Sequence, residues 1–445
     1  MPLPSSTPNA TLVCVSGPDK GKRLVLTESE TTLGRSTDCH LLSDDADVAG
    51  HHLTLWSKAG AVTYRTTSGS AVFVDGRPIR DGQIEPGQQL RVGRSYWQLA
   101  STATSNAATT GNNAAADLIE RLSEQITTAA GLEKIERFNV SETFSEVFGK
   151  HAADEIEDYL IVGTRTTTPD LAAVEANWPR PWLFFRAFIL TAVAYALFIF
   201  GWNQFRNLNL IPGLIMIGSL AGPFTLLIFF FEINVARNVS LYQVLRLMLI
   251  GGGLSLIVSL FGFQMTNMSR TLGPPAAGII EEIGKAAALL LVVNQLKYRW
   301  TLNGLLFGAA VGAGFAVFES AGYAFRLGVL AANSSTVLFD VIQTRGILSV
   351  LGGHVLWTAL VGAALWRVRG DQRLRLSMLM DPGFLRVFGL AVAAHMIWDM
   401  SFELPLYLKY IALGFVTWVA LLSVTQGGLR QIKNEQLQSA AALDA

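Results

Sequence analysis

The sequence predicts a multidomain protein, in which an N-terminal all-β sandwich is followed by an all-α polytopic membrane domain of about eight transmembrane helices. Two observations support this prediction. Short apolar runs alternate with turn signals in the first hundred residues, whereas long apolar segments fill the region from 181 to 425. The expected boundaries are a sandwich over 1–100, a linker with amphipathic helices over 101–180, the membrane domain over 181–425 and a cytoplasmic tail over 426–445.

The predicted strands of the sandwich are short and rich in β-branched and aromatic residues. Runs such as 11–15, 52–56 and 96–99 are separated by turn pairs that include Asp75-Gly76 and Pro86-Gly87. Pro and Gly at this spacing favour tight turns between antiparallel strands.

The order of motifs in this region resembles the forkhead-associated (FHA) family. The matching stretches are Leu33-Gly-Arg-Ser36, Asp47-Val-Ala-Gly-His-His-Leu53, Ser68-Gly-Ser-Ala-Val-Phe-Val-Asp-Gly76 and Gly87-Gln-Gln-Leu-Arg-Val-Gly93. The resemblance implies a phosphothreonine peptide site at Arg35, Ser36 and Ser70, and hence a phosphorylated cytoplasmic partner. The family has Ser where this chain has Ala49, and Asn where it has Ser70, so a docking module without phosphate recognition is the alternative.

Residues 101–115 have the composition of a flexible linker, and 116–162 are predicted to be helical. The eight predicted spans are 183–202, 210–231, 242–263, 274–296, 302–330, 346–367, 384–402 and 404–424. Lys and Arg are more numerous at the ends that would face the cytoplasm if the N-terminus does. The positive-inside rule therefore predicts a multi-pass inner-membrane protein with both termini in the cytoplasm.

Charged residues lie inside the fourth apolar segment, where Glu281, Glu282 and Lys285 fall within five positions of one another. A charge at membrane depth costs about 3 kcal/mol on insertion scales, so three together indicate a function. A structural ion pair within a helix bundle is the simpler alternative. In a helix, Lys285 can pair with either glutamate, which leaves the other free for a different partner.

Four further ionisable residues lie inside other predicted spans: Glu319, His354, His395 and Asp399. Counted along their helices, all four reach the middle or outer part of the bilayer, so they can meet Glu281 and Glu282 if the spans are neighbours. We expect them to share one cavity. A single buried histidine is usually a satisfied core residue, but two histidines with several carboxylates at one depth favour a site.

This pattern resembles the PrsW family of membrane proteases, distant relatives of the CAAX prenyl proteases. The matching stretches are Glu281-Glu-Ile-Gly-Lys285, Gly314-Phe-Ala-Val-Phe-Glu-Ser-Ala-Gly-Tyr323, 345–359 and His395-Met-Ile-Trp-Asp399. The resemblance implies hydrolysis of a peptide bond in a membrane protein, typically an anti-sigma factor. Lys285 and Tyr323, which lie in the matching stretches, are expected to support the catalytic residues.

Amide hydrolysis requires an activated water molecule and stabilisation of an oxyanion. We expect Glu281 or Glu282 to be the base, and His395, oriented by Asp399, to protonate the leaving amine. His354 and Glu319 would position the water. No cofactor is needed in this glutamate-type scheme, but His354, His395 and Glu319 could instead bind zinc.

Two other functions remain open from the residues alone. Buried carboxylates and histidines also suit a proton-coupled transporter or channel, and an inactive membrane scaffold is the third candidate. The formal net charge is zero, so no basic field points to nucleic acid as a partner. Two cysteines predict no disulfide framework, and the N-terminal residues lack the features of a signal peptide.

Overall fold

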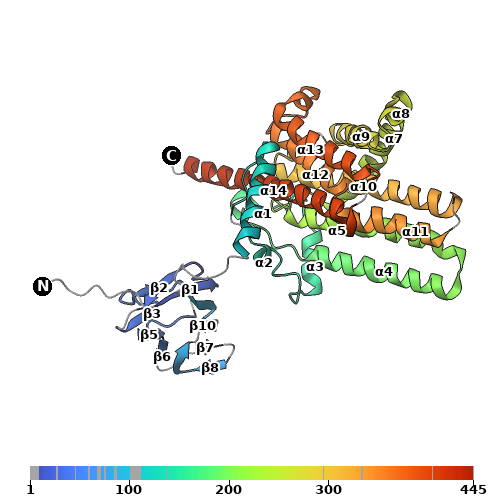
Figure 1. Cartoon of the computed structure of the whole chain (residues 1–445). Coiled ribbons are helices and arrows are strands. Elements are labelled where there is room, and N and C mark those ends of the chain that lie inside the picture. Colours follow the sequence, from blue (N-terminus) through green and yellow to red (C-terminus); the bar gives the residue numbers. More distant parts are fainter. Residues whose placement is uncertain are drawn as a thin grey trace. The chain divides into compact units, whose positions relative to one another are not determined.

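The computed structural model describes residues 10–26, 29–45, 47–58, 61–67, 72–74, 77–84, 88–100, 112–136, 138–293, 295–331, 334–402 and 404–443. The chain divides into two compact units, Met1–Gly111 and Asn112–Ala445 (Figure 1). The first contains strands and the second contains helices, as predicted.

The N-terminal unit is a sandwich of two sheets. One sheet has the strand order β2-β1-β11-β10-β7-β8 and the other has the order β4-β3-β5-β6-β9. The strands are β1 (Ala10–Ser16), β2 (Arg23–Leu26), β3 (Thr31–Gly34), β4 (Leu41–Leu42), β5 (Leu53–Lys58), β6 (Ala61–Thr66), β7 (Val72–Val74), β8 (Arg77–Ile79), β9 (Asp81–Ile84), β10 (Gln89–Val92) and β11 (Ser95–Ala100). Alternate residues such as Leu12 and Cys14 are buried, and Tyr64 and Trp97 fill the space between the sheets.

Two buried carboxylates tie the loops of this sandwich together. Asp45 is fully buried and accepts hydrogen bonds from the backbone N–H groups of Asp47 (3.1 Å) and Arg94 (2.6 Å) and from the hydroxyl of Ser95 (3.1 Å). Burial alone would raise the pKa of Asp45, but these donors hold that pKa below its usual value. Asp19 accepts from Ser43 in the same way.

The described part of the second unit consists of helices joined by loops. Its α-helices are α1 (Asn112–Ala129), α2 (Val140–Thr143), α3 (Ala153–Leu160), α4 (Leu183–Phe205), α5 (Ile211–Ile233), α6 (Leu241–Arg246), α7 (Gly252–Met265), α8 (Met268–Leu272), α9 (Ala276–Val292), α10 (Thr301–Tyr323), α11 (Ser335–Val341), α12 (His354–Arg369), α13 (Pro382–Asp399) and α14 (Leu408–Leu443). Helix α10 packs against α12 and α5, and α5 against α4, while α9 packs against α7 and α13 (Figure 1).

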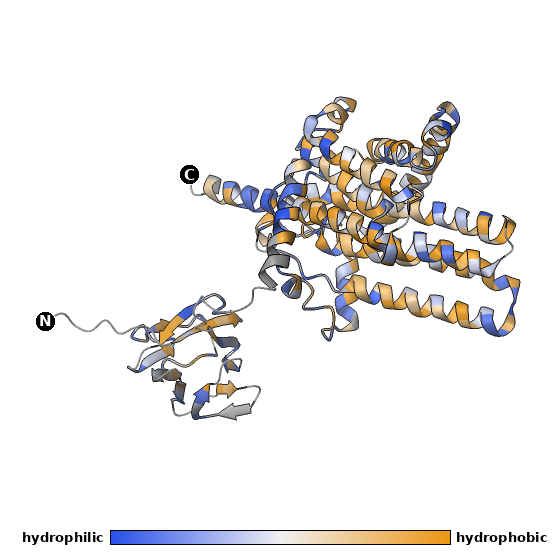
Figure 2. Ribbon diagram, in the orientation of Figure 1, coloured by the Kyte–Doolittle hydropathy of each residue, from blue (hydrophilic) through white to orange (hydrophobic). Residues whose placement is uncertain are grey.

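Six segments of the described chain are long and apolar enough to cross a membrane: Leu183–Phe205, Leu208–Ile233, Leu241–Met265, Thr301–Ala331, Ser335–Arg369 and Pro405–Ala441 (Figure 2). The chain is therefore a multi-pass membrane protein, but the predicted count of eight is not confirmed. The two predicted spans that fall short are those over α9 and α13. Helix α9 has only 17 residues and contains three charged side chains, and α13 contains His395 and Asp399 of the candidate site.

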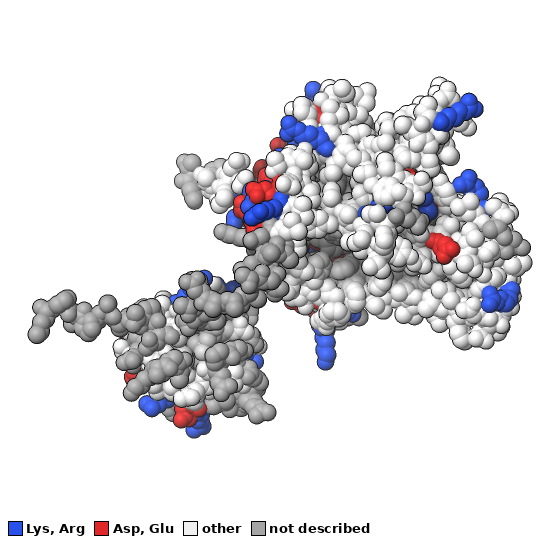
Figure 3. Space-filling view, viewed as in Figure 1, with Lys and Arg blue, Asp and Glu red and all other residues white. Residues whose placement is uncertain are grey.

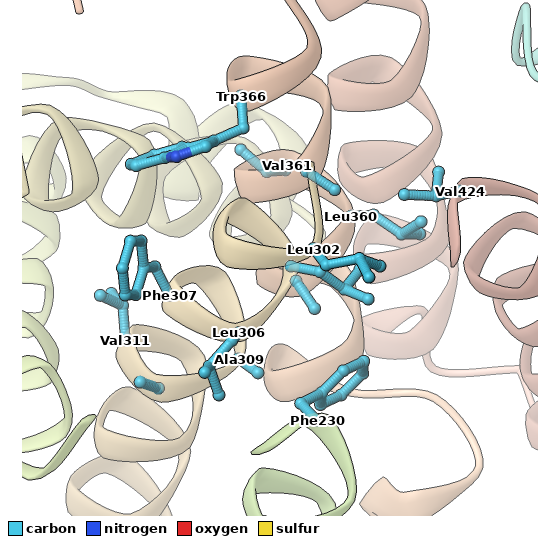
Figure 4. Close-up of a cluster of buried hydrophobic side chains, with 14 of the residues drawn as sticks. Phe230, Leu302, Leu306, Phe307, Ala309, Val311, Leu360, Val361, Trp366 and Val424 are labelled. Carbon is cyan, nitrogen blue, oxygen red and sulfur yellow. The ribbon is translucent and has the colours of Figure 1, made fainter. Parts of the chain in front are cut away.

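Helix α10 is the centre of the bundle, and small residues allow its close contact with α12. A Cβ atom on Gly308 would lie 2.0 Å from the carbonyl oxygen of Thr358, and one on Gly312 would lie 2.4 Å from that of His354. Only glycine permits this approach. Around this contact, Leu306, Phe307, Leu360 and other apolar side chains form the buried core (Figure 4).

Candidate active site

The predicted charged residues of α9 are buried together. Glu282 and Lys285 are fully buried, and Glu281 is 5% exposed. Lys285 Nζ lies 2.6 Å from Glu282 Oε1, which is the i,i+3 pair that their spacing allows. Lys285 Nζ also lies 2.9 Å from His354 Nδ1 and 4.6 Å from the ring centre of Phe315. The cation is thus surrounded by partners from three helices.

The two histidines come from different helices and meet at this pair. His395 on α13 places Nδ1 2.8 Å from Glu282 Oε1. His354 begins α12, and its ring centre lies 4.8 Å from that of His395. Trp357 stacks on His395 with ring centres 4.7 Å apart, which fixes the plane of the imidazole. Each histidine therefore has a defined orientation.

Each histidine also contacts a carboxylate on the side away from Glu281. Glu282 holds Nδ1 of His395, and Glu319 Oε2 lies 2.9 Å from Nε2 of His354. These contacts assign the proton of a neutral imidazole to the nitrogen nearest the carboxylate. The lone pairs are then on Nε2 of His395, which faces the interior of the site, and on Nδ1 of His354, which accepts a hydrogen bond from Lys285 Nζ (2.9 Å).

Glu281 lies between those two nitrogens. Its Oε2 atom is 3.6 Å from Nε2 of His395 and 4.0 Å from Nδ1 of His354. This oxygen is buried and accepts no hydrogen bond from any residue that the structure describes. Ligand atoms of Glu281, His354 and His395 all lie within 4.8 Å of one another. The three side chains form the centre of the cluster.

Glu319 and Asp399 lie at the margin of this centre. Glu319 Oε2 is 2.5 Å from Nη2 of Arg345, whose guanidinium group lies 4.2 Å above the ring of Tyr323. Asp399 Oδ2 is 3.4 Å from Nε2 of His395. The structure thus brings together all six predicted residues. It differs from the predicted zinc set in one member, because Glu281 rather than Glu319 faces both histidines.

A small cavity adjoins the cluster. It has a volume of about 10 Å³, close to the smallest cavity that can hold one water molecule. Its lining includes Arg345, His354, Trp357 and Asp399. A polar space of this size beside the histidines suits a reacting water molecule.

Arg345 and Trp357 lie in the matching stretch 345–359, but the sequence analysis gave neither of them a role. The predicted span begins at 346, one residue after Arg345, whereas the helical segment that contains Arg345 begins at Ser335. The π-helical turn Ile342–Ile347 brings its side chain to Glu319. The available signal was an arginine bordering an apolar run, nine positions before a buried histidine.

The residues predicted to bind phosphothreonine lie at the edge of the β-sandwich. Arg35 is exposed, and its N–H donates to the carbonyl of Ala49 (3.0 Å), while that of Ser36 donates to Gly50 (2.9 Å). Two of the predicted residues therefore lie beside the loop that contains Ala49. Ser70, the third, lies outside the described residues.

Comparisons with known proteins agree with both parts of the chain. Residues 222–425 match the family described as PrsW family intramembrane metalloprotease. Residues 14–103 match the cytoplasmic domain of an inner membrane component of the type III secretion system. No curated protein matches the chain.

Several solved domains, among them FHA domains, are similar to the N-terminal part. The FHA domain of FhaA, solved with the intracellular domain of Rv3910, is 22% identical, with a TM-score of 0.19, over 20% of this chain and 99% of that chain. The FHA domain of CT664 from Chlamydia trachomatis is 16% identical, with a TM-score of 0.20, over 21% and 99%. The cytoplasmic domain of the sorting platform protein PscD from P. aeruginosa is 21% identical, with a TM-score of 0.20, over 22% and 84%.

The motifs, the helical membrane unit and the family match coincide in the C-terminal part, and the two-sheet sandwich coincides with the N-terminal match. Residues 222–425 of this chain match the PrsW family of intramembrane metalloproteases, and its N-terminal region is a two-sheet β-sandwich that is similar to FHA domains.

Proposed function

We propose that the cluster around Glu281 hydrolyses a peptide bond of a membrane protein, with an anti-sigma factor as the expected kind of substrate. One observation carries the proposal. A buried carboxylate oxygen of Glu281, without a hydrogen bond from the described residues, lies within 4.0 Å of one nitrogen of each histidine. Such an arrangement is costly for stability, and it is expected where a proton or a cation is handled.

The surrounding groups have distinct roles in this proposal. Glu281 accepts a proton from the attacking water. Nε2 of His395, which lies 3.6 Å from Glu281 Oε2, takes up this proton and delivers it to the leaving amine nitrogen. Glu282 orients His395 through Nδ1, and Lys285 neutralises Glu282. Asp399 lies beside Nε2 of His395, where it favours the protonated imidazole.

The donor set also fits a divalent metal such as zinc. Glu281 Oε2, His354 Nδ1 and His395 Nε2 would hold it, and a carboxylate supports each histidine from behind, as is usual for metal-binding imidazoles. A bound metal would polarise the substrate carbonyl and acidify a water molecule. Lys285 would have to move from Nδ1 of His354 while keeping its contact with Glu282.

Metal content and cleavage, measured on the same purified protein, test the proposal. We expect His354→Ala, His395→Ala and Glu281→Gln each to abolish cleavage of a membrane substrate while the protein stays folded. If the site binds a metal, each variant should also contain less zinc than the parent protein by elemental analysis, and a chelator should stop cleavage by the parent protein. Full cleavage in chelator by protein without metal would support the glutamate-type scheme. Cleavage by all three variants would contradict the site.

We propose that the FHA-like domain is a cytoplasmic docking or regulatory module. Arg35 is exposed beside the loop that holds Ala49, so one of the groups that the family uses for phosphate is present and another is missing. Weak binding of phosphothreonine peptides, lost in Arg35→Ala, is the expected result. Tight binding that Arg35→Ala does not change would show that the phosphate site lies elsewhere.

A further inference from the structure

A second polar cavity lies at the other end of the helices that carry the candidate active site. It has a volume of about 800 Å³. Its lining comes from the segment after α1, the start of α10, the end of α12, the start of α13 and the middle of α14. Figure 3 shows charged side chains of both signs gathered near α1 on the visible face of the helical unit.

This cavity is distinct from the catalytic cluster. Along α12, thirteen residues separate His354 from Arg367, or about 20 Å at the helical rise. Along α13, nine residues separate Arg386 from His395, or about 14 Å. Nothing in the proposed hydrolysis uses the residues of this second cavity.

Two arginines in the cavity converge on one glycine. Arg367 Nη1 donates to the carbonyl oxygen of Gly131 over 3.4 Å. A Cβ atom on Gly131 would lie 3.0 Å from Nη1 of Arg386, and the positive φ of Gly131 (65°) also favours glycine here. Two guanidinium groups are therefore held against the same residue, although like charges repel.

Among the described residues, no ion pair joins Arg367 or Arg386 to a carboxylate. The third arginine of the cavity differs, because Arg430 pairs with Glu133 (3.0 Å) and with Glu136 (2.6 Å). Asp381 lines the cavity too, but its Oδ1 accepts the N–H of Gly383 (2.7 Å) and caps α13. The cavity thus contains two converging cations that the described carboxylates do not neutralise.

A general excess of arginine on the cytoplasmic side of membrane proteins would explain why arginines occur in this region, but not why Arg367 and Arg386 converge on one glycine. The positive-inside rule is satisfied equally by Arg373 and Arg375, which are exposed in the next loop and do not line the cavity. Basic pockets between transmembrane helices on the cytoplasmic side are typical sites for anionic lipid headgroups. Guanidinium pairs suit the geometry of phosphate oxygens.

We propose that this cavity binds a phosphate group through Arg367 and Arg386. An anionic phospholipid headgroup or a soluble phosphate compound could supply that group, because the recognising chemistry is the same. The cavity volume exceeds that of a phosphate alone, so part of the attached molecule also enters it.

The bound group would also contact the segment that leads from the FHA-like domain to the membrane helices. Gly131, Leu132 and Glu133 form one wall of the cavity. The carbonyl of Glu133 accepts the hydroxyl of Ser423 on α14, and the carbonyl of Lys134 accepts the side-chain amide of Gln426 over 2.7 Å. Ligand binding would therefore hold this connecting segment more firmly on α14.

The test uses the full-length protein purified with phosphatidylglycerol or with phosphatidylcholine. Retained lipid is counted by native mass spectrometry, and inorganic phosphate is titrated in a thermal unfolding assay. We expect Arg367→Gln combined with Arg386→Gln to weaken binding at least about tenfold, since each charge-assisted hydrogen bond contributes about that factor. The matched control Arg373→Gln removes the same charge outside the cavity and should stay within about twofold of the parent protein.

Retention of phosphatidylglycerol over phosphatidylcholine, lost in the double variant, supports a lipid headgroup. Stabilisation by phosphate without lipid retention, again lost in the double variant, supports a soluble ligand. Equal binding by the double variant and the parent, an equal loss in Arg373→Gln, or no binding of either probe would overturn the proposal. If the double variant does not fold, Arg386→Lys and Arg386→Gln are compared, since only the first keeps the charge.

Discussion

Glu281 and Glu282 are neighbours in sequence, but their contacts predict opposite effects of the same substitution. Glu282 Oε1 lies 2.6 Å from Lys285 Nζ and 2.8 Å from His395 Nδ1 in a fully buried position. Glu282→Gln leaves Lys285 as a buried cation without its counter-ion, and breaking a buried pair in this way costs about 3–5 kcal/mol. We therefore expect a large loss of stability together with a loss of cleavage.

Glu281→Gln removes a buried charge whose Oε2 atom has no hydrogen bond from the described residues. We expect this variant to be as stable as the parent protein, within about 1 kcal/mol, or more stable, because removing an unsatisfied charge relieves a desolvation cost. Cleavage should nevertheless fall by about 10²–10⁴-fold, the usual contribution of a general base, and further if metal is lost.

Thermal unfolding in detergent and cleavage of a membrane substrate, measured on both variants, check this prediction. Glu282→Gln combined with Lys285→Met provides the control, because the double variant removes both charges of the pair. It should recover most of the stability that Glu282→Gln loses, without recovering cleavage, since His395 remains unsupported. The reasoning would be refuted by a Glu281→Gln variant that unfolds as readily as Glu282→Gln, or by one that cleaves at the parent rate.

Three other predictions follow from other parts of the chain. Arg345→Gln should destabilise the protein by about 3 kcal/mol and slow cleavage, because Glu319 loses its cation. Arg345→Lys keeps the cation and should be more stable and cleave faster than Arg345→Gln in the same assays. Equal losses of stability and cleavage in the two variants would contradict this reasoning. Because the folded sandwich lowers the pKa of Asp45, its stabilising effect should be present above the ordinary value of 3.8 and decline as the pH falls below it. Hydrogen exchange of the full chain should show this decline in the stability of the sandwich at low pH. The decline should be smaller in Asp45→Asn, and the same pH profile in the variant and the parent would exclude Asp45 as the cause. A reporter fused near residue 332 should read outside the cytoplasm and one near Gln372 inside, and the reverse would overturn the proposed topology.

The sandwich was predictable because its strands follow a period of two with turn residues between them. The buried carboxylates within it were not predictable. Asp19 and Asp45 lie in loops rich in polar residues, where nothing local distinguishes a buried aspartate from an exposed one. Their partners Ser43 and Ser95 lie far apart in sequence, so only the folded chain brings them together.

The membrane spans show where hydropathy fails as a predictor. Helices α9 and α13 were both anticipated from apolar runs, but neither is among the candidate spans, and α9 has only 17 residues. They carry Glu281, Glu282, Lys285, His395 and Asp399. The charged and polar residues that indicated a site therefore also make these two helices less like ordinary membrane spans.

Within the site, contacts along one helix could be predicted from the spacing of residues, whereas contacts between helices could not. The pairing of Glu282 with Lys285 follows from i,i+3 geometry. The partners of Glu319 depend instead on a π-helical turn at Ile342–Ile347, which adds a residue to the helical repeat and redirects Arg345. The residue pattern contains no signal for such a turn.

Glu232 has a consequence for how the first membrane helices are inserted during synthesis. This buried carboxylate at the end of α5 accepts the backbone N–H groups of Trp182, Leu183 and Phe184, each over 2.8 Å, and so caps the start of α4. Helix α4 packs mainly against α5, and only 17% of its most apolar stretch is buried within the protein. The first residues of α4 and the carboxylate of α5 satisfy one another only when both helices are in place. We therefore expect α4 and α5 to enter the lipid as one hairpin, because α4 acquires its cap only after about fifty residues beyond Trp182 have been synthesised.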